Sequence, residues 1–327
     1  MILTIIIPHY NNVALLGRCL HSIVASKLGD ELQVVVVDDG STDGQRQQAE
    51  ALVAELSSKY SKLALQLITN PKNQGASAAR NKGLLSAQGR FVWFVDADDE
   101  IDIELMNLWW PKLKELDSHV ELLHIGPMVD VKQHVTKHPS SITHHPTRLS
   151  DILIPRSHCL DHTTYWISRE FLINNPDIRY IENCKILEDS IFVLQLLEKA
   201  KNIVSADDCS LYIRHTDSPS VTAGAWSKNK SATFMPFIQL FFSHLSQFKA
   251  RHADLPHIED LYHRYSYVYM RVLAVKGVPT ALYRELFYKP IIQDTFIPRN
   301  IKEHLLKNIV IHSLLSFVCR ILRPSQD

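Results

Sequence analysis

The first hundred residues alternate between short apolar runs and longer segments in which apolar residues recur at helical spacing. Four runs rich in β-branched and aromatic residues have the length of buried strands: Leu3–Ile7, Gln33–Val37, Leu63–Thr69 and Phe91–Val95. Three segments between them have a helical pattern: Asn12–Ala25, Gly44–Tyr60 and Ser77–Ala87. Strands this apolar are buried on both faces, so the alternation predicts a parallel sheet with helices on both sides.

The pattern is looser beyond Asp102. Further elements are expected there: strands at Glu121–Pro127 and Ser210–His215, helices at Ser168–Asn175 and residues 188–201, and a loop rich in His, Pro, Ser and Thr at Asp130–Ser150. After Thr222 the helical patterns become longer, and we expect packing helices at Phe234–His244 and Leu261–Leu273. The sequence therefore predicts an α/β domain followed by a C-terminal helical region.

Composition narrows the classes of partner and compartment. The 327 residues include 35 Lys and Arg against 35 Asp and Glu, so no overall field attracts nucleic acid, which we do not expect as a partner. The five cysteines are odd in number and form no CxxC pair, which suits a reducing, cytoplasmic compartment. The apolar N-terminus lacks a basic segment, and no run approaches the roughly 18 apolar residues of a spanning helix, so we expect neither signal peptide nor transmembrane segment.

Three of the expected strands end in polar or acidic segments. The first leads into Pro8–Asn11, the second into Asp38–Ser41, and the fourth into the acidic run Asp96–Glu100. In a parallel sheet the carboxyl ends of the strands share one edge, where ligands bind. Each acidic segment also has a simpler explanation: Asp38–Asp43 could be a turn and helix N-cap, and Asp96–Glu100 the first turn of a helix. Several acids repel one another, however, and a bound cation would relieve that repulsion.

The spacing Asp96-Ala97-Asp98 suits a nucleotide diphosphate. Mg²⁺ or Mn²⁺ takes about six oxygens, commonly from one or two carboxylates together with phosphate and water. A D-x-D spacing is a weak signal alone, because it occurs often by chance. The first strand is not followed by G-x-G-x-x-G, and no P-loop is present, which argues against a dinucleotide dehydrogenase and a P-loop enzyme.

Several segments agree in order and spacing with one family. IIIPHYNN, VVVVDDGSTD and NPKNQGASAARNKGLLSAQGRFVWFVDADD, within residues 1–102, resemble the nucleotide-binding half of the family 2 glycosyltransferases, which are inverting enzymes of GT-A fold. The resemblance implies a Rossmann-like, mainly parallel central sheet with helices on both faces. It also implies a nucleotide-sugar-binding half at 1–105, an acceptor-binding half at 106–222, and a C-terminal helical region at 223–327.

The resemblance assigns donor-binding roles to residues at the strand ends. Pro8 and Tyr10 would line the base pocket, and Asp39 would accept a hydrogen bond from the base ring. Asp96 would contact the ribose. Asp98 would bind the metal ion, Mn²⁺ or Mg²⁺.

Three basic residues would complete the donor site. Arg80, in ASAARN, would lie near the diphosphate or the sugar, although a surface arginine on a helix is the simpler explanation. LYIRHTDSPSVT resembles the family's segment that folds over the donor diphosphate, so Arg214 would pair with phosphate and His215 could complete the metal shell. A lone histidine is more often structural than a ligand, and both explanations of His215 stay open.

The expected catalytic base lies in the second half of the domain. TTYWISREFLINNPDIRYIENCKILEDSIF is similar to the family's segment that ends in Glu-Asp-x-x-Phe. By that match Asp189 takes the proton of the acceptor hydroxyl, and Glu188 shapes the site beside it. The ordinary explanation for an isolated pair is an acidic helix start. Tyr165–Ile167 departs from the small and basic residues common there in relatives, which leaves the acceptor type open.

Residues 301–324 form a broad apolar stripe with four positive charges and one acid. Such a helix fits the membrane interface, where a lipid-linked acceptor is found. It fits equally well against the catalytic domain or a second subunit of a homo-oligomer. No Gln-x-x-Arg-Trp motif is present, so we do not expect processive synthesis and export of a polymer.

The sequence therefore predicts a metal-dependent, inverting glycosyltransferase of hexosyltransferase type in the cytoplasm, with peripheral contact at the inner membrane face. It would move one sugar from a nucleotide sugar, with UDP the expected nucleotide, to a glycan or lipid-linked acceptor in lipopolysaccharide or capsule assembly. A non-catalytic sugar-nucleotide or glycan-binding protein is the alternative, against which Asp98 and Asp189 together count. A phosphate-accepting receiver domain would carry its paired acids after the first strand, not the second.

Overall fold

In the computed structural model, the chain folds into two compact units. The residues that the structure describes are 1–126, 128–131, 144–153, 160–206, 210–216, 228–276, 278 and 283–284. The first unit comprises Met1–Ile152, His158–Cys184 and Glu188–Ser218, and the second Leu153–Ser157, Lys185–Leu187 and Pro219–Asp327. The domain boundaries expected after residues 105 and 222 remain predictions.

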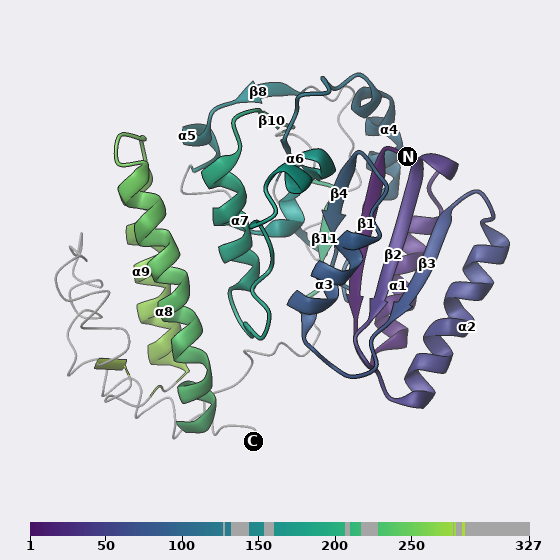
Figure 1. The fold of residues 1–327 in the computed structure, drawn as a ribbon, viewed down its shortest axis with the longest axis horizontal. Helices are drawn as coiled ribbons and strands as arrows, with labels where there is room; N and C mark the ends of the chain where they lie inside the picture. Colours follow the sequence, from purple (N-terminus) through teal and green to yellow (C-terminus); the bar gives the residue numbers. More distant parts are fainter. Residues whose placement is uncertain are drawn as a thin grey trace. The chain divides into compact units, whose positions relative to one another are not determined.

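The first unit is built on a twisted sheet that has eight strands within the described residues (Figure 1). Their order is β3 (Ala64–Thr69), β2 (Leu32–Asp38), β1 (Leu3–His9), β4 (Phe91–Phe94), β9 (Tyr165–Ser168), β6 (Leu122–His124), β10 (Ile203–Ser205) and β8 (His145–Thr147). β1 pairs in parallel with β2 and β4, and β2 pairs in parallel with β3. The carboxyl ends of these four strands therefore lie at one edge, which confirms the expected arrangement of the first hundred residues.

Helices cover both faces of this sheet. In Figure 1, α3 (Ala76–Leu85) lies in front of β1 and β2, while α1 (Val13–Val24) lies behind them, and α2 (Asp43–Lys59) lies beside β3. Asn12 caps α1, because its side chain accepts a hydrogen bond from the Leu15 N–H at 3.2 Å. α3 approaches the sheet closely at Gly83, where a Cβ atom would lie 2.5 Å from Cγ2 of Ile6.

A small second sheet adjoins the acidic run. Its order is β5 (Glu100–Ile101), β11 (Tyr212–Arg214) and β7 (Val129–Asp130). β11 pairs antiparallel with β5, so a segment more than a hundred residues away lies directly beside the acids. α4 (Ile103–Lys114) follows, and its first turn is capped by the Asp102 side chain, which accepts from the Leu105 N–H at 2.9 Å.

Some short elements differ from expectation. All four residues of β9 are buried, although the sequence pattern predicts no strand there, because four residues are too few to show a period. β9 becomes a strand by pairing on both sides, antiparallel with β4 and β6. The expected loop Asp130–Ser150 is wrong in part, since β8 lies within it and pairs with β10. The helices expected at Ser168–Asn175 and residues 188–201 are confirmed as α6 (Arg169–Asn174) and α7 (Glu188–Lys199).

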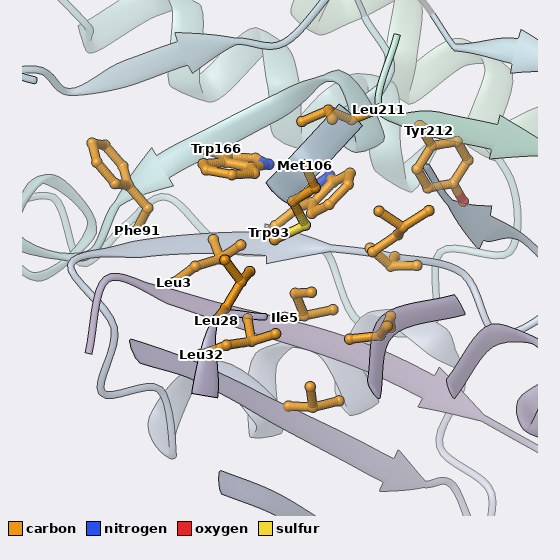
Figure 2. Packing of buried hydrophobic residues seen from close by; sticks show 14 of the residues in the cluster. Leu3, Ile5, Leu28, Leu32, Phe91, Trp93, Met106, Trp166, Leu211 and Tyr212 are labelled. Atoms are coloured by element: carbon orange, nitrogen blue, oxygen red, sulfur yellow. The ribbon is translucent and has the colours of Figure 1, made fainter. Parts of the chain in front are cut away.

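Aromatic side chains connect strands of the first unit that are far apart in the sequence. Figure 2 shows Trp93 of β4 between Trp166 of β9 and Tyr212 of β11, with ring centroids 5.5 and 6.2 Å apart. Nε1 of Trp93 donates to the Thr163 carbonyl at 2.7 Å, which satisfies its buried polar atom. Removing apolar surface of this kind from water stabilises the fold by roughly 25 cal/mol per Å². This cluster therefore fixes β11 and β9 against the strand that ends in the acids.

The second unit contains two long helices, α8 (Lys228–Arg251) and α9 (Ile258–Val275). They pack through aromatic pairs such as Phe241 with Tyr265, whose ring centroids lie 5.2 Å apart. The expected packing helices at Phe234–His244 and Leu261–Leu273 lie within them. Among the described residues, no helix combines the length and the apolar character needed to cross a membrane. Residues 301–324 lie outside the described residues.

Candidate active site

The ends of β1 and β2 are tied together at the expected edge. The Asn11 N–H donates to Oγ of Ser41 at 2.8 Å, and the Thr42 N–H donates to Oδ1 of Asn11 at 2.8 Å. Asn11 adopts a φ of 52°, a left-handed conformation that asparagine tolerates better than most residues. The chain thereby turns away from the sheet just after Tyr10, whose side chain is half exposed at the mouth of this edge.

The neighbouring acids Asp38 and Asp39 have separate partners. Asp38 is fully buried, and it accepts from the hydroxyl and the N–H of Ser41. Asp39 accepts from the loop that precedes α3: from the Asn70 side chain at 2.8 Å, the Gln74 N–H at 3.1 Å and the Gly75 N–H at 2.6 Å. The segment Asp38–Asp43 does form the expected turn before α2, whose N-cap residue is Thr42, although no side chain makes a capping hydrogen bond there.

Asp96 is held by a buried arginine. Nη2 of Arg80 donates to Oδ1 of Asp96 at 2.8 Å, and Nε2 of His162 lies 3.9 Å from the same oxygen. Burial alone would raise the pKa of Asp96, but the charge of Arg80, with a contribution from His162, lowers the pKa overall. Asp96 is therefore ionised at neutral pH, and its side chain is one-third exposed, as a ribose ligand would need to be.

The other acids of the run are tied to β11. The Tyr212 hydroxyl donates to Oδ2 of Asp99 at 2.5 Å, and the His215 N–H donates to Oδ1 at 2.7 Å. Burial, reinforced by the charges of Asp96 and Asp98, raises the pKa of Asp99 to about 7. The explanation that these acids form a first helical turn is wrong, since α4 begins only at Ile103.

Asp98 lies half-buried in the same turn, and its carbonyl accepts from Nη2 of Arg18. The expected metal ligand His215 directs Nε2 to the carboxylate of Glu100. Arg214 is exposed at the end of β11, and its charge helps to lower the pKa of Asp96. The structure thus brings Arg214 and His215 to the acidic turn, and their donor and metal roles remain predictions.

Arg80 joins the acidic turn to the start of α7. While Nη2 contacts Asp96, Nη1 donates to Oε1 of Glu188 at 3.1 Å. The guanidinium lies over the Tyr180 ring, 5.1 Å from its centroid, and only 5% of the residue is exposed. The surface-arginine explanation is therefore wrong. Its charge is matched by two carboxylates, one of them 108 positions away along the chain.

Asp189 is the second residue of α7 and follows Glu188, at which the helix begins. It accepts a hydrogen bond from the Ser190 N–H at 2.7 Å. Burial, followed by the charges of Glu188 and Asp161, raises the pKa of Asp189 to about 8. A carboxyl group with its pKa near the working pH is suited to receive a proton.

His162 and Tyr180 lie beside Arg80 and Asp96, and sequence patterns did not single them out. His162 is 2% exposed, and neither ring nitrogen has a hydrogen-bond partner. Its ring packs edge-on against Phe94 and Tyr180, at centroid distances of 6.2 and 5.8 Å. Burial and the nearby Arg80 lower the pKa of His162, so it is neutral at pH 7. His162 lies just before β9, and its contacts come from segments distant in the sequence, so no local pattern marks it.

The acidic turn suits a divalent cation that is bound by a protein carboxylate on one side and by a diphosphate on the other. No group of three His, Cys, Asp or Glu side chains in the described part of the chain is arranged to hold a metal by itself. Mg²⁺ commonly binds through one or two carboxylates plus substrate phosphates, not through an all-protein cage. The half-buried Asp98 on a turn fixed by its neighbours meets that requirement.

Comparison with known proteins identifies the family. The model of glycosyl transferase family 2 matches residues 4–176, which include both the acidic turn and β9. The chain belongs to glycosyl transferase family 2. The expected family is thus confirmed.

The similar proteins of known name are longer than this chain. The minor teichoic acid biosynthesis protein GgaB of Bacillus subtilis is 26% identical over 229 residues, which are 70% of this chain and 24% of that protein. The poly(ribitol-phosphate) beta-N-acetylglucosaminyltransferase TarS of Staphylococcus aureus is 31% identical over 213 residues, or 64% of this chain and 35% of that protein. The chain therefore spans about a quarter to a third of the length of these family 2 relatives.

Solved structures support the fold. Residues 1–349 of S. aureus TarS in complex with UDP-GlcNAc match with a TM-score of 0.63 and 22% identity, covering 98% of this chain and 92% of that one. The mannosyltransferase PcManGT of Pyrobaculum calidifontis, in complex with GDP-Man and Mn²⁺, matches with a TM-score of 0.54 and 18% identity, covering 98% and 86%. The expected GT-A fold is confirmed.

Proposed function

We propose that this family 2 protein transfers one sugar from a UDP-sugar to a hydroxyl of a glycan or lipid-linked acceptor, with inversion at the anomeric carbon. The observation that carries the proposal is the bridge of Arg80 between Asp96 and Glu188. Arg80 contacts both the carboxylate expected at the ribose and Glu188, the residue just before the expected base Asp189. A donor and an acceptor bound at these two places would share one reaction centre.

The donor half is supported by the strand ends. Asp39 is oriented by three donors from the loop at residues 70–75, and Tyr10 stands half exposed beside it, where an aromatic ring can stack on a base. Asp96 is ionised and partly exposed. TarS has been solved with UDP-GlcNAc and with UDP, which favours UDP as the nucleotide here.

The chemical step is a single displacement. The acceptor oxygen forms a bond to the anomeric carbon while the bond from that carbon to the phosphate oxygen breaks. The proton of the acceptor hydroxyl passes to the carboxylate of Asp189, and the nucleoside diphosphate leaves. A Mn²⁺ or Mg²⁺ ion held by Asp98 would neutralise the charge on the leaving group. PcManGT, which has a similar fold, has been solved in complex with GDP-Man and Mn²⁺. His215 and Arg214 lie at the same turn and are proposed to contact the cation and phosphate.

The biological setting of the acceptor is a cell-surface polymer. The names of GgaB and TarS refer to teichoic acid and poly(ribitol phosphate), which favours a polymer of that kind over lipopolysaccharide or capsule. We place the reaction at the cytoplasmic side of the membrane, where UDP-sugars are made and lipid-linked acceptors are presented. Residues 301–324 are proposed to contact that membrane or a second subunit.

The test is a panel of nucleotide sugars offered to the full chain with Mn²⁺, with Mg²⁺ and with EDTA. We expect one UDP-sugar to raise the melting temperature in a metal-dependent way and to be slowly hydrolysed to UDP. Binding without any turnover, in the presence of polymer acceptors, would support the alternative of a non-catalytic binding protein. No stabilisation by any nucleotide sugar would overturn the proposal.

A further inference from the structure

One side of α1 holds the acidic turn by its backbone. Nη2 of Arg18 donates to the Asp98 carbonyl, and Sγ of Cys19 donates to the Asp96 carbonyl at 3.7 Å. One turn further along the helix, Oγ of Ser22 accepts from the Ile101 N–H at 3.1 Å. All three contacts reach main-chain atoms, so they fix the path of the turn without occupying its carboxylates.

We propose that Arg18 is a positioning residue for the cation and diphosphate. It fixes the peptide of Asp98, and with it the direction of the carboxylate that would bind the metal. The inference rests on the proposed function, because it gives Arg18 a role only if Asp98 meets a metal-bound diphosphate.

Arg18 differs from the other two side chains in the kind of contact that it makes. A hydrogen bond from a charged donor is roughly twice as strong as one between neutral groups, whereas a thiol is a weak donor. Its charge also lies against a run that contains Asp96, Asp98, Asp99 and Glu100. These acids repel one another, so the positive charge of Arg18 stabilises the turn that carries them.

The geometry of a guanidinium is also required. Arginine presents its donors in a rigid, planar fork, while lysine carries a compact charge on a flexible stem. Nε of Arg18 is buried without a hydrogen-bond partner. An unsatisfied buried donor destabilises the fold, so Arg18 is not explained as a residue that serves stability alone.

The experiment measures UDP binding to the full chain by calorimetry, with Mn²⁺ and separately with EDTA. The variants are Arg18→Met, which removes the donors, and Arg18→Lys, which keeps the charge. Ser22→Ala is the structural control, because it removes a contact of α1 with the same segment but not with Asp98. Arg46→Met is the surface control, since Arg46 pairs with Asp43 on α2.

We expect Arg18→Met to raise the Kd of UDP in Mn²⁺ by about tenfold, equivalent to about 1.4 kcal/mol, and to leave the Kd in EDTA within about twofold. Arg18→Lys should recover part of the loss. Ser22→Ala should lower the melting temperature while leaving the metal-dependent part of UDP binding unchanged. Should Arg18→Met fail to fold, Arg18→Lys takes its place. It should then weaken UDP binding in Mn²⁺ more than Ser22→Ala does, and equal binding by these two variants would contradict the inference.

Three results would overturn the inference. If Mn²⁺ lowers the Kd of UDP by the same factor for the native chain and for Arg18→Met, the proposed role of Arg18 is wrong while the proposed function stands. If Arg18→Met weakens binding equally in Mn²⁺ and EDTA, Arg18 is merely structural. If the native chain binds no UDP under either condition, the proposed function fails and the inference fails with it.

Discussion

The acidic turn and the start of α7 hold their carboxylates in different ways. In the turn, Asp96 pairs with Arg80, and Asp99 accepts from Tyr212 and from the backbone of His215. At α7, Asp189 has another acid, Glu188, as its sequence neighbour, and burial raises its pKa to about 8. A carboxylate that contacts a ribose or a metal has to stay charged, whereas a base has to be able to hold a proton. The two surroundings match these two tasks.

Arg80 contacts both the acidic turn and the start of α7, and it contributes to the difference in pKa between Asp96 and Asp189. Its guanidinium lowers the pKa of Asp96 directly. At α7 it donates to Glu188, and its effect on the pKa of Asp189 is smaller than that of burial and of Glu188. One cation thus keeps the donor-side carboxylate ionised while the expected base stays easy to protonate.

The largest effect is expected when the base itself is removed. Asp189→Asn keeps the shape of the side chain but can no longer accept the acceptor proton. We expect the turnover number to fall by about 10²–10⁴, with UDP affinity within about twofold, because the donor contacts belong to other residues. Steady-state rates and calorimetry on the same preparation measure the two quantities.

Asp177→Asn is the matched control, since Asp177 is an exposed acid near the same helix that pairs with Lys199. It should leave turnover unchanged. Near-normal turnover of Asp189→Asn would remove Asp189 from the mechanism, and Glu188 would then be the acid to test.

The next effect is on stability, and it comes from breaking the bridge. Arg80→Met leaves the carboxylates of Asp96 and Glu188 without their buried cation. Removing one partner of a buried ion pair costs about 3–5 kcal/mol, so the free energy of unfolding in urea should fall by that amount. The pKa of Asp96 should rise as well.

Arg46→Met serves as the control, because the Arg46–Asp43 pair lies at the surface of α2. Surface pairs contribute about 0–1 kcal/mol. Equal losses for the two variants would show that the bridge does not hold the turn and α7 together.

Sequence patterns were sufficient where structure depends on neighbours along the chain. Four apolar runs become β1, β2, β3 and β4, and Asn12 caps α1 as its residue type favours. The expected site residues Asp39, Asp96 and Asp98 do lie on turns at one sheet edge. These features depend on periodicity and turn chemistry, which are visible in a single sequence.

Patterns failed where distant segments decide the structure. β9 is a strand only because β4 and β6 flank it. A helix after the acidic run was considered only as one that begins at Asp96, whereas α4 begins at Ile103 and contains Pro111, with the buried Trp109 and Trp110 packed into the core. The burial of Arg80 and the contact of Tyr212 with Asp99 depend on residues 108 and 113 positions away, which no local pattern contains.

A smaller loss of stability is expected at the other contact of the acidic turn. Tyr212→Phe removes the hydroxyl that donates to Asp99 and accepts from the Asp96 N–H at 3.3 Å. Hydrogen bonds to charged groups contribute about 1.5–3 kcal/mol, and the aromatic packing against Trp93 in Figure 2 is kept. Urea unfolding should show a loss in that range, smaller than for Arg80→Met. A loss as large as that of Arg80→Met would place the anchor of the turn on β11 instead of on Arg80.

The pH dependence of stability and activity should distinguish the carboxylate at the start of α7 from those of the acidic turn. The pKa of Asp189 lies at about 8 in the folded state, above its ordinary value of 3.8. Between these pH values the folded protein holds a proton that the unfolded chain has lost, so the free energy of unfolding falls as pH rises. The slope from this group is at most about 1.4 kcal/mol per pH unit.

Activity should change in the opposite direction, because only the ionised carboxylate can take the acceptor proton. At saturating donor we expect kcat/KM for the acceptor to rise by up to about tenfold per pH unit and to level off near pH 8. The difference between the pH profiles of the native chain and of Asp189→Asn isolates the contribution of Asp189 from that of Asp99, whose pKa is also raised. If stability and activity rise together over the roughly two pH units below the pKa of Asp189, the proton that leaves α7 is not the one that limits the reaction. The contrast between the two acidic segments would then be structural only.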